Sequence, residues 1–99
     1  MKRIVILGST GSIGTNTLDI IGKFTEKFQA VGLTANGNVD KLEEQVRTFS
    51  PAVVAMADQA AAERLRGRCK GLKTTILSGT EGLRQTATLA EADLVISAI

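Results

Sequence analysis

Three glycines at intervals of three residues follow the first apolar run of the chain. Gly8, Gly11 and Gly14 stand between the run at residues 4–7 and an apolar-periodic segment that begins at Ile13. This strand, turn and helix context suits a dinucleotide, because backbone N–H groups at the start of a helix can face its pyrophosphate. Gly8 would let the chain turn, Gly11 would leave room for the ligand, and Gly14 would allow close helix packing. The alternative is that the glycines only make a tight turn.

The residues between the glycines are consistent with a dinucleotide site. Thr10 and Ser12 add hydroxyl donors to the backbone N–H groups of the loop. No Gly-Lys-Ser or Gly-Lys-Thr follows the glycines, so the P-loop of nucleoside triphosphatases is excluded.

The choice between NAD and NADP depends on the end of the second expected strand. An acidic residue about 20 positions beyond the loop would bind the ribose 2′-hydroxyl of NAD. The sequence has Asn36, Gly37 and Asn38 there, and the nearest acid, Asp40, belongs to the start of the next helix. Amide side chains, a helix N-terminus and the charge of Lys41 favour a 2′-phosphate, and hence NADP. The alternative is that these residues form only a turn and a helix cap.

The cysteine and charged residues of the sequence do not form a catalytic or metal-binding pattern. The chain has no histidine, and its one cysteine, Cys69, has basic neighbours that could lower its thiol pKa but no partner base. No paired carboxylates or metal-ligand spacings occur, so we expect no catalytic residue and no metal ligand in these residues. A basic cluster is interpreted as a solvated segment in preference to a nucleic-acid patch. Its members are Arg64, Arg66, Arg68, Lys70 and Lys73.

The expected elements alternate along the chain. Strands are predicted at residues 4–7, 28–34, 52–56, 74–77 and 93–99, the first, third and fifth of them as buried strands. Helices are predicted from residue 13 to about 24, at 39–49 after an Asn38 cap, from the Asp58 cap to about 66, and at 80–89. Such alternation predicts an α/β fold of the Rossmann-like, doubly wound class, with a mostly parallel sheet and helices on both faces.

Composition limits the remaining possibilities. The 99 residues are 43% hydrophobic and 22% charged, which predicts one folded domain over residues 1–99. Only 3% are aromatic, so the stacking platforms of single-stranded nucleic-acid binders are lacking. No apolar run approaches the length of a signal peptide or a membrane span, and the single cysteine fits a cytoplasmic protein. The last expected strand runs to the final residue, which predicts a portion of a longer protein; the alternative is a complete small domain that ends in an edge strand.

The motifs together resemble a known enzyme family. The glycine loop at residues 8–14 is followed by Thr17-Leu18-Asp19, and the later landmarks cover the rest of the chain. These are residues 33–39, Leu42, Gln45, residues 49–51, Ala92-Asp93 and residues 97–99. In this combination they resemble the start of 1-deoxy-D-xylulose 5-phosphate reductoisomerase.

The resemblance implies an NADPH-dependent oxidoreductase of the non-mevalonate isoprenoid pathway. Such an enzyme converts 1-deoxy-D-xylulose 5-phosphate to 2-C-methyl-D-erythritol 4-phosphate with a divalent metal, Mg or Mn. It further implies that Thr10, Gly11, Ser12 and Ile13 contact NADPH, and that Asn36, Gly37 and Asn38 lie near its adenosine phosphate. The metal ligands, the sugar-phosphate site and the catalytic and C-terminal domains of the family lie downstream, so the 99 residues alone are expected to be inactive. The full enzyme is expected to be a homodimer without nucleic-acid or membrane partners.

Two alternatives remain at this point. The glycine loop alone is shared with other oxidoreductases, such as aspartate-semialdehyde dehydrogenases. A non-catalytic dinucleotide-binding module is the second alternative.

Overall fold

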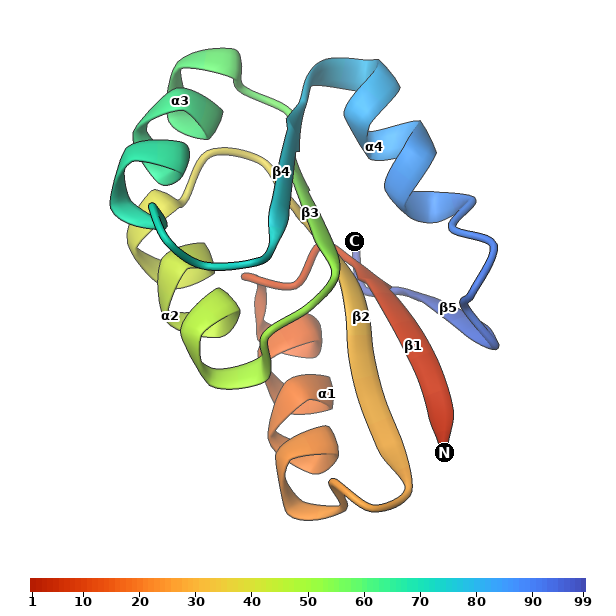
Figure 1. Ribbon diagram of the computed structural model, residues 1–99. Coiled ribbons are helices and arrows are strands. Elements are labelled where there is room, and N and C mark those ends of the chain that lie inside the picture. Colours follow the sequence, from red (N-terminus) through yellow and green to blue (C-terminus); the bar gives the residue numbers. More distant parts are fainter.

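Five strands and four helices alternate along the chain in the computed structural model, which describes residues 1–99 (Figure 1). The strands are β1 (Lys2–Leu7), β2 (Phe28–Ala35), β3 (Val53–Met56), β4 (Thr75–Ser78) and β5 (Leu94–Ser97). The helices are α1 (Ser12–Lys23), α2 (Val39–Phe49), α3 (Gln59–Arg68) and α4 (Gly79–Ala87). All nine predicted elements are present, with shifts of a few residues at their ends.

The strands form one sheet in the order β4-β3-β2-β1-β5, and every neighbouring pair is parallel. The order reverses at β1, which has β2 on one side and β5 on the other. This confirms the predicted doubly wound class and places a topological switch point beside β1. Ligands of such sheets bind outside the carboxyl ends of the strands at this point.

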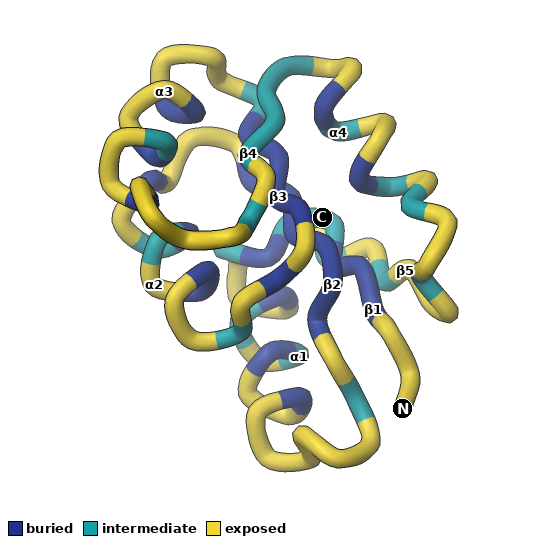
Figure 2. Tube along the Cα trace, in the orientation of Figure 1, coloured by how far each residue is buried: buried dark blue, intermediate teal, exposed yellow.

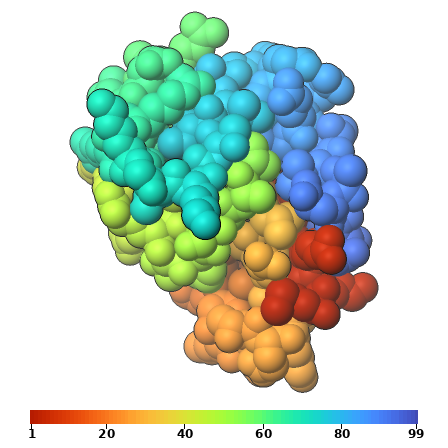
Figure 3. Space-filling model, viewed as in Figure 1, coloured from red at the N-terminus to blue at the C-terminus, as the bar shows by residue number.

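The helices cover the two faces of the sheet unequally. Figure 1 shows α1, α2 and α3 on one side and α4 on the other. The cause is handedness: the crossovers from β1 to β4 all advance in one direction, and the crossover from β4 to β5 returns. Because parallel crossovers are right-handed, the returning connection must cross the opposite face. The return also brings β5 beside the N-terminal strand, as Figure 3 shows.

The centre of the sheet is buried on both faces. Ile4, Val5 and Ile6 of β1 are at most 3% exposed, as their unbroken apolar run predicts. Ile4 and Ile6 belong to the main core under α1 to α3, whereas Val5 lies on the α4 side. Gly32 of β2 would weaken a strand in isolation, but a Cβ there would meet Thr86 of α4 at 3.1 Å. This glycine therefore allows the close approach of α4.

One burial expectation is wrong. The last strand was expected to be buried, yet Leu94 and Val95 of β5 are 46% and 43% exposed (Figure 2). An edge strand has one neighbour and incomplete cover, which an apolar sequence does not reveal. The apolar residues of α1 also differ in exposure: Leu18 and Ile21 are buried, while Ile13, Ile20 and Phe24 are exposed.

The predicted helix caps are confirmed. The Asn38 side chain accepts a hydrogen bond from the N–H of Lys41, and Asp58 accepts one from Ala61. Ser50, in the left-handed conformation before Pro51, ends α2. The third helix continues to Arg68, two residues past its predicted end. No helix of the chain combines the length and apolar character needed to cross a membrane.

Cys69 lies in a different environment from the one its neighbours in sequence suggest. It is buried, and burial together with the charge of Glu43 raises the pKa of its thiol, although Arg47 opposes the shift. The basic neighbours therefore do not activate it. We expect Cys69 to react with a disulfide reagent at pH 8 at least about tenfold more slowly in the folded protein than in denaturant. A time course of thiol release with and without denaturant measures this, and equal rates would contradict it.

Candidate functional site

A pocket of about 390 Å³ opens at the carboxyl end of the sheet, at the switch point beside β1. Gly8, Thr10 and Gly11 line it from the loop after β1, and Thr34 and Asn36 line it from the end of β2. The segments after β3 and β5 and one side chain of α4 complete the wall. The predicted glycine loop and the predicted second-strand residues thus meet in one place.

The loop leaves β1 through a turn that requires glycine. Gly8 has φ +81°, a conformation that side chains disfavour. Its N–H donates to the Thr34 carbonyl at 3.1 Å and to the Thr34 hydroxyl at 3.0 Å, and the Ser9 N–H donates to the same carbonyl at 2.9 Å. These bonds anchor the first half of the loop to β2.

The other two glycines have different surroundings. A Cβ on Gly14 would lie 2.4 Å from the Gly8 carbonyl oxygen and 2.6 Å from the Ser9 Cα. Gly14 is therefore needed for close packing, but its partner is the loop itself and not the sheet. A Cβ on Gly11 would meet only the Gly8 carbonyl oxygen, at 3.9 Å. No part of the chain fills the space beside Gly11, as expected for a position that faces a ligand.

Hydrogen-bond donors face this space. The N–H groups of Thr10 and Gly11 donate to no atom of the chain. Gly11 is the N-cap of α1, and it has no side chain to bind the first N–H groups of the helix. The positive end of the helix dipole adds to these donors. The start of α1 can therefore bind a phosphate group.

A second, polar hollow continues from the loop toward α2. Thr10, Gly11, Ser12 and Asn16 line it together with Lys41 of α2. The two hollows share Thr10 and Gly11, so they form adjacent parts of one surface. No carboxylate forms an ion pair with Lys41, whose charge remains available to an anion.

The predicted residues after β2 are exposed but make different contributions. Asn36 lines the main pocket, whereas Gly37 and Asn38 line neither hollow. The Asn38 side-chain oxygen is used by the cap of α2, which leaves its amide group without a partner in the chain. Ile13 also lies outside both hollows and is 61% exposed.

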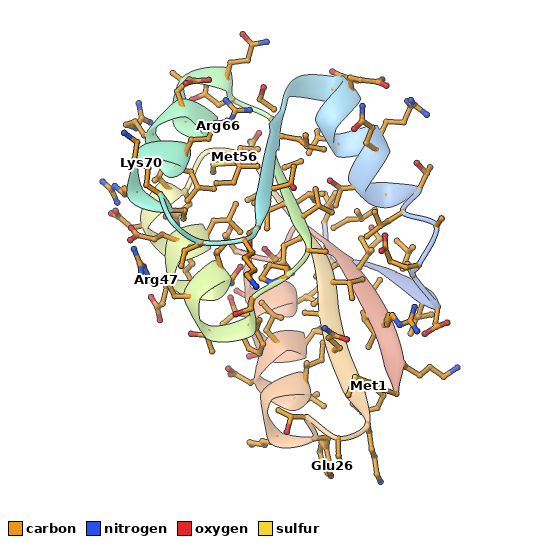
Figure 4. All side chains as sticks on the ribbon, in the orientation of Figure 1. Met1, Glu26, Arg47, Met56, Arg66 and Lys70 are labelled. Atoms are coloured by element: carbon orange, nitrogen blue, oxygen red, sulfur yellow. The ribbon has the colours of Figure 1, made fainter.

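Asp40 does not face this surface as a free carboxylate. It pairs with Arg68 of α3, and this contact raises the pKa of the Arg68 guanidinium. Arg66 donates to the Ile76 carbonyl at 2.9 and 3.1 Å, and Arg47 donates to the Arg68 carbonyl at 2.9 Å. Two arginines of the basic cluster are thus bound to neighbouring elements, on the side formed by α2 and α3 (Figure 4). Arg64, Arg68, Lys70 and Lys73 are nevertheless exposed, as expected for a solvated segment.

The sequence motif did not reveal one contact of the loop. The Ser9 hydroxyl donates to Oε1 of Gln45 at 2.7 Å, and Nε2 of Gln45 donates to the Ser9 carbonyl at 2.9 Å. Both residues are buried. A glutamine on the inner face of an otherwise amphipathic helix was the only local signal, and it did not identify the partner. No three histidine, cysteine or acidic side chains gather in positions that could hold a metal ion.

Comparison with known proteins gives a consistent result along the whole chain. The family model of 1-deoxy-D-xylulose 5-phosphate reductoisomerase matches residues 4–99. The reductoisomerase of Thermodesulfovibrio yellowstonii is 50% identical over 99 residues, and that of Geotalea uraniireducens is 48% identical. Both comparisons cover 100% of this chain and 26% of the relative, so the chain spans about a quarter of the length of these relatives.

Solved structures of the same enzyme have the same fold. The Zymomonas mobilis reductoisomerase in complex with NADPH superposes with a TM-score of 0.93 at 31% identity, covering 99% of this chain and 26% of that one. A reductoisomerase in complex with NADPH, fosmidomycin and magnesium gives 0.94 at 36% identity, covering 100% and 24%. The match of 96 consecutive residues and the identities near 50% leave one assignment: the chain belongs to the 1-deoxy-D-xylulose 5-phosphate reductoisomerase family.

Proposed function

We propose that residues 1–99 form the NADPH-binding N-terminal portion of a 1-deoxy-D-xylulose 5-phosphate reductoisomerase. The observation that carries the proposal is the open space at Gly11, beside unpaired N–H groups at the start of α1. A pyrophosphate fits such a place, because it is anionic, accepts several hydrogen bonds and requires close approach to the backbone. Thr10, Gly11, Ser12 and Ile13 are the proposed contacts on this side.

The 2′-phosphate of the cofactor would bind near Asn36, Gly37 and Asn38. The exposed amides and the unpaired Lys41 support this placement, and Arg68 neutralises Asp40, the one carboxylate of the first turn of α2. A 2′-phosphate therefore meets net positive charge, whereas an NAD-type site would offer a carboxylate to the ribose. The capping role of Asn38 is compatible with this, since the cap uses only its side-chain oxygen.

Calorimetric titration with NADPH and, separately, with NADH tests the proposal. We expect NADPH to bind at least about tenfold more tightly, because charge-assisted hydrogen bonds to the 2′-phosphate contribute on the order of 1.5–3 kcal/mol. Absence of binding to either dinucleotide by the folded protein would refute the proposal. Equal affinities would refute the 2′-phosphate site alone.

The substitution Asn38→Asp separates the cap from the phosphate contact. Aspartate caps a helix as well as asparagine does, so the melting temperature should stay the same. The added negative charge should weaken NADPH binding on the order of tenfold and leave NADH binding unchanged. Titration of both dinucleotides against the variant measures this, and an unchanged NADPH affinity would place the 2′-phosphate elsewhere.

The activity of the full-length enzyme is part of the same proposal. It would convert 1-deoxy-D-xylulose 5-phosphate to 2-C-methyl-D-erythritol 4-phosphate by rearrangement and reduction with NADPH. The divalent metal, Mg or Mn, and the sugar phosphate would be held by residues outside this chain, since the side chains present here do not group into a metal site. The family assignment sets aside the semialdehyde dehydrogenase alternative.

The assembly and the location follow from the same resemblance. We propose that residues 1–99 are one domain of a longer chain, that the full-length enzyme is a homodimer, and that it works in the cytoplasm without nucleic-acid or membrane partners. Light scattering on the full-length protein tests the dimer, and a monomer mass would contradict it.

A further inference from the structure

We infer that Gln45 is a positioning residue for the cofactor: its side chain holds the glycine loop so that the Thr10 N–H faces the pyrophosphate site. The inference rests on the proposed NADPH function and adds to it a residue outside the glycine motif. Gln45 lies on α2, 36 positions along the chain from its partner Ser9.

The contact between the two residues is complete and buried. Ser9 donates through its hydroxyl and accepts through its carbonyl, so both ends of the Gln45 amide are used, at 2.7 and 2.9 Å. Gln45 is 6% exposed and Ser9 is 0% exposed. Buried polar groups without partners are strongly unfavourable, so water cannot easily replace this contact. The contact therefore holds Ser9 in one orientation relative to α2.

The orientation of Ser9 determines the direction of the next donor. The chain has no cis peptide bond, and a trans peptide places the Ser9 carbonyl and the Thr10 N–H on opposite sides of their common bond. Because the carbonyl points inward to Gln45, the N–H points outward. Thr10 lines both hollows, and its N–H has no acceptor in the chain. The preceding N–H groups, of Gly8 and Ser9, instead bind Thr34.

Two substitutions distinguish positioning from simple packing. Gln45→Met keeps the length of the side chain and removes both hydrogen bonds, whereas Ser9→Ala removes only the hydroxyl contact. We expect Gln45→Met to raise the Kd of NADPH and of NADH alike, by about tenfold, because the pyrophosphate is common to both. Ser9→Ala keeps the carbonyl contact, so its effect should stay below about threefold. The NADPH to NADH ratio should not change, in contrast to Asn38→Asp.

The substitution Gln45→Glu adds a readout that packing alone would not move. A protonated carboxyl group accepts from the Ser9 hydroxyl and donates to the Ser9 carbonyl as the amide does, but an ionised one cannot donate. The charged groups lining the hollow beside Gln45 are Asp19 of α1 and Lys41 and Glu44 of α2. Burial and the two acids favour the protonated form, and Lys41 opposes it.

The Kd of the Gln45→Glu variant is divided by the Kd of the unchanged protein at each pH. The titration of the cofactor affects both Kd values equally, so it does not affect their ratio. We expect the ratio of their Kd values to be near one at about pH 5.5 and to rise toward about tenfold at about pH 8.5. Circular dichroism at each pH shows that the variant is folded. If Gln45→Met fails to fold, this series decides the question.

The outcomes separate the inference from the function on which it rests. Weaker binding of both dinucleotides by folded Gln45→Met, with recovery of Gln45→Glu at low pH, would support the positioning role. Normal affinity in folded Gln45→Met, or a flat pH ratio in Gln45→Glu, would overturn this inference alone. If the unchanged protein bound neither dinucleotide, the proposed function and this inference would both be refuted.

Discussion

Replacing Gly11 with valine is expected to weaken NADPH binding at least about 100-fold while the protein remains folded. The new side chain would enter the space in which the nearest atom of the chain is 3.9 Å from a Cβ. It would keep the pyrophosphate from the N–H groups at the start of α1, and loss of even one or two charge-assisted hydrogen bonds accounts for this factor. Calorimetric titration measures the affinity.

The folded structure can accommodate the Gly11→Val substitution. Gly11 has φ −80°, which any residue adopts, so the substitution introduces no backbone strain. Valine is a poorer N-cap than glycine, so some stability is lost. A poorer cap lowers the free energy of unfolding by only about 1 kcal/mol. Gly11→Ser is the matched variant, because serine caps α1 well and would compete with the phosphate for the same N–H groups. Undiminished NADPH binding in folded Gly11→Val would show that the loop is only a structural turn.

Replacing Gly14 with alanine is expected to have the opposite character, a large loss of stability. The added Cβ would lie 2.4 Å from a backbone oxygen and 2.6 Å from a backbone carbon, and neither atom can move without displacing the loop. Overpacking of this kind costs about 3 kcal/mol. For a domain of this size, the melting temperature should fall by roughly 15 °C.

Gly22→Ala is the control for Gly14→Ala, since it makes the same substitution in the same helix. A Cβ at Gly22 would lie 3.6 Å from the Phe49 ring, an ordinary contact. Alanine is favoured over glycine inside a helix, so this variant should be more stable by about 0.5–1 kcal/mol. Thermal denaturation followed by circular dichroism compares the two variants. Similar melting temperatures would contradict the packing role of Gly14.

The two glycines therefore separate binding from folding within one short sequence motif. Gly11 lies beside open space and Gly14 against the backbone, although both occupy equivalent-looking places in the motif. Loss of binding with little loss of stability at Gly11, and loss of both at Gly14, is the combined result that the proposed cofactor site predicts.

Much of the molecule could be predicted from the sequence, because the responsible interactions are local. The run at Ile4 to Ile6 is apolar at every position, as a central parallel strand requires. Asn38 and Asp58 cap helices through bonds to residues three positions away. The glycine loop comes directly after a strand and directly before a helix, so its context is also visible along the chain. These features led to the doubly wound fold and to the family.

The remaining features depend on contacts between distant residues. The exposure of Leu94 and Val95 follows from the place of β5 at the edge of the sheet, and an apolar sequence is the same at an edge and in the centre. The pKa of the Cys69 thiol is raised, contrary to the effect expected from its basic sequence neighbours, because desolvation by burial and the charge of Glu43 outweigh the opposing charge of Arg47. Gln45 meets Ser9 only when α2 packs beside the loop. By itself, the sequence determined the elements, their order and the place of the glycine loop, since each is set within a few residues. Only the tertiary structure decided which side chains orient that loop, because a hydrogen bond across 36 positions leaves no periodic or local pattern.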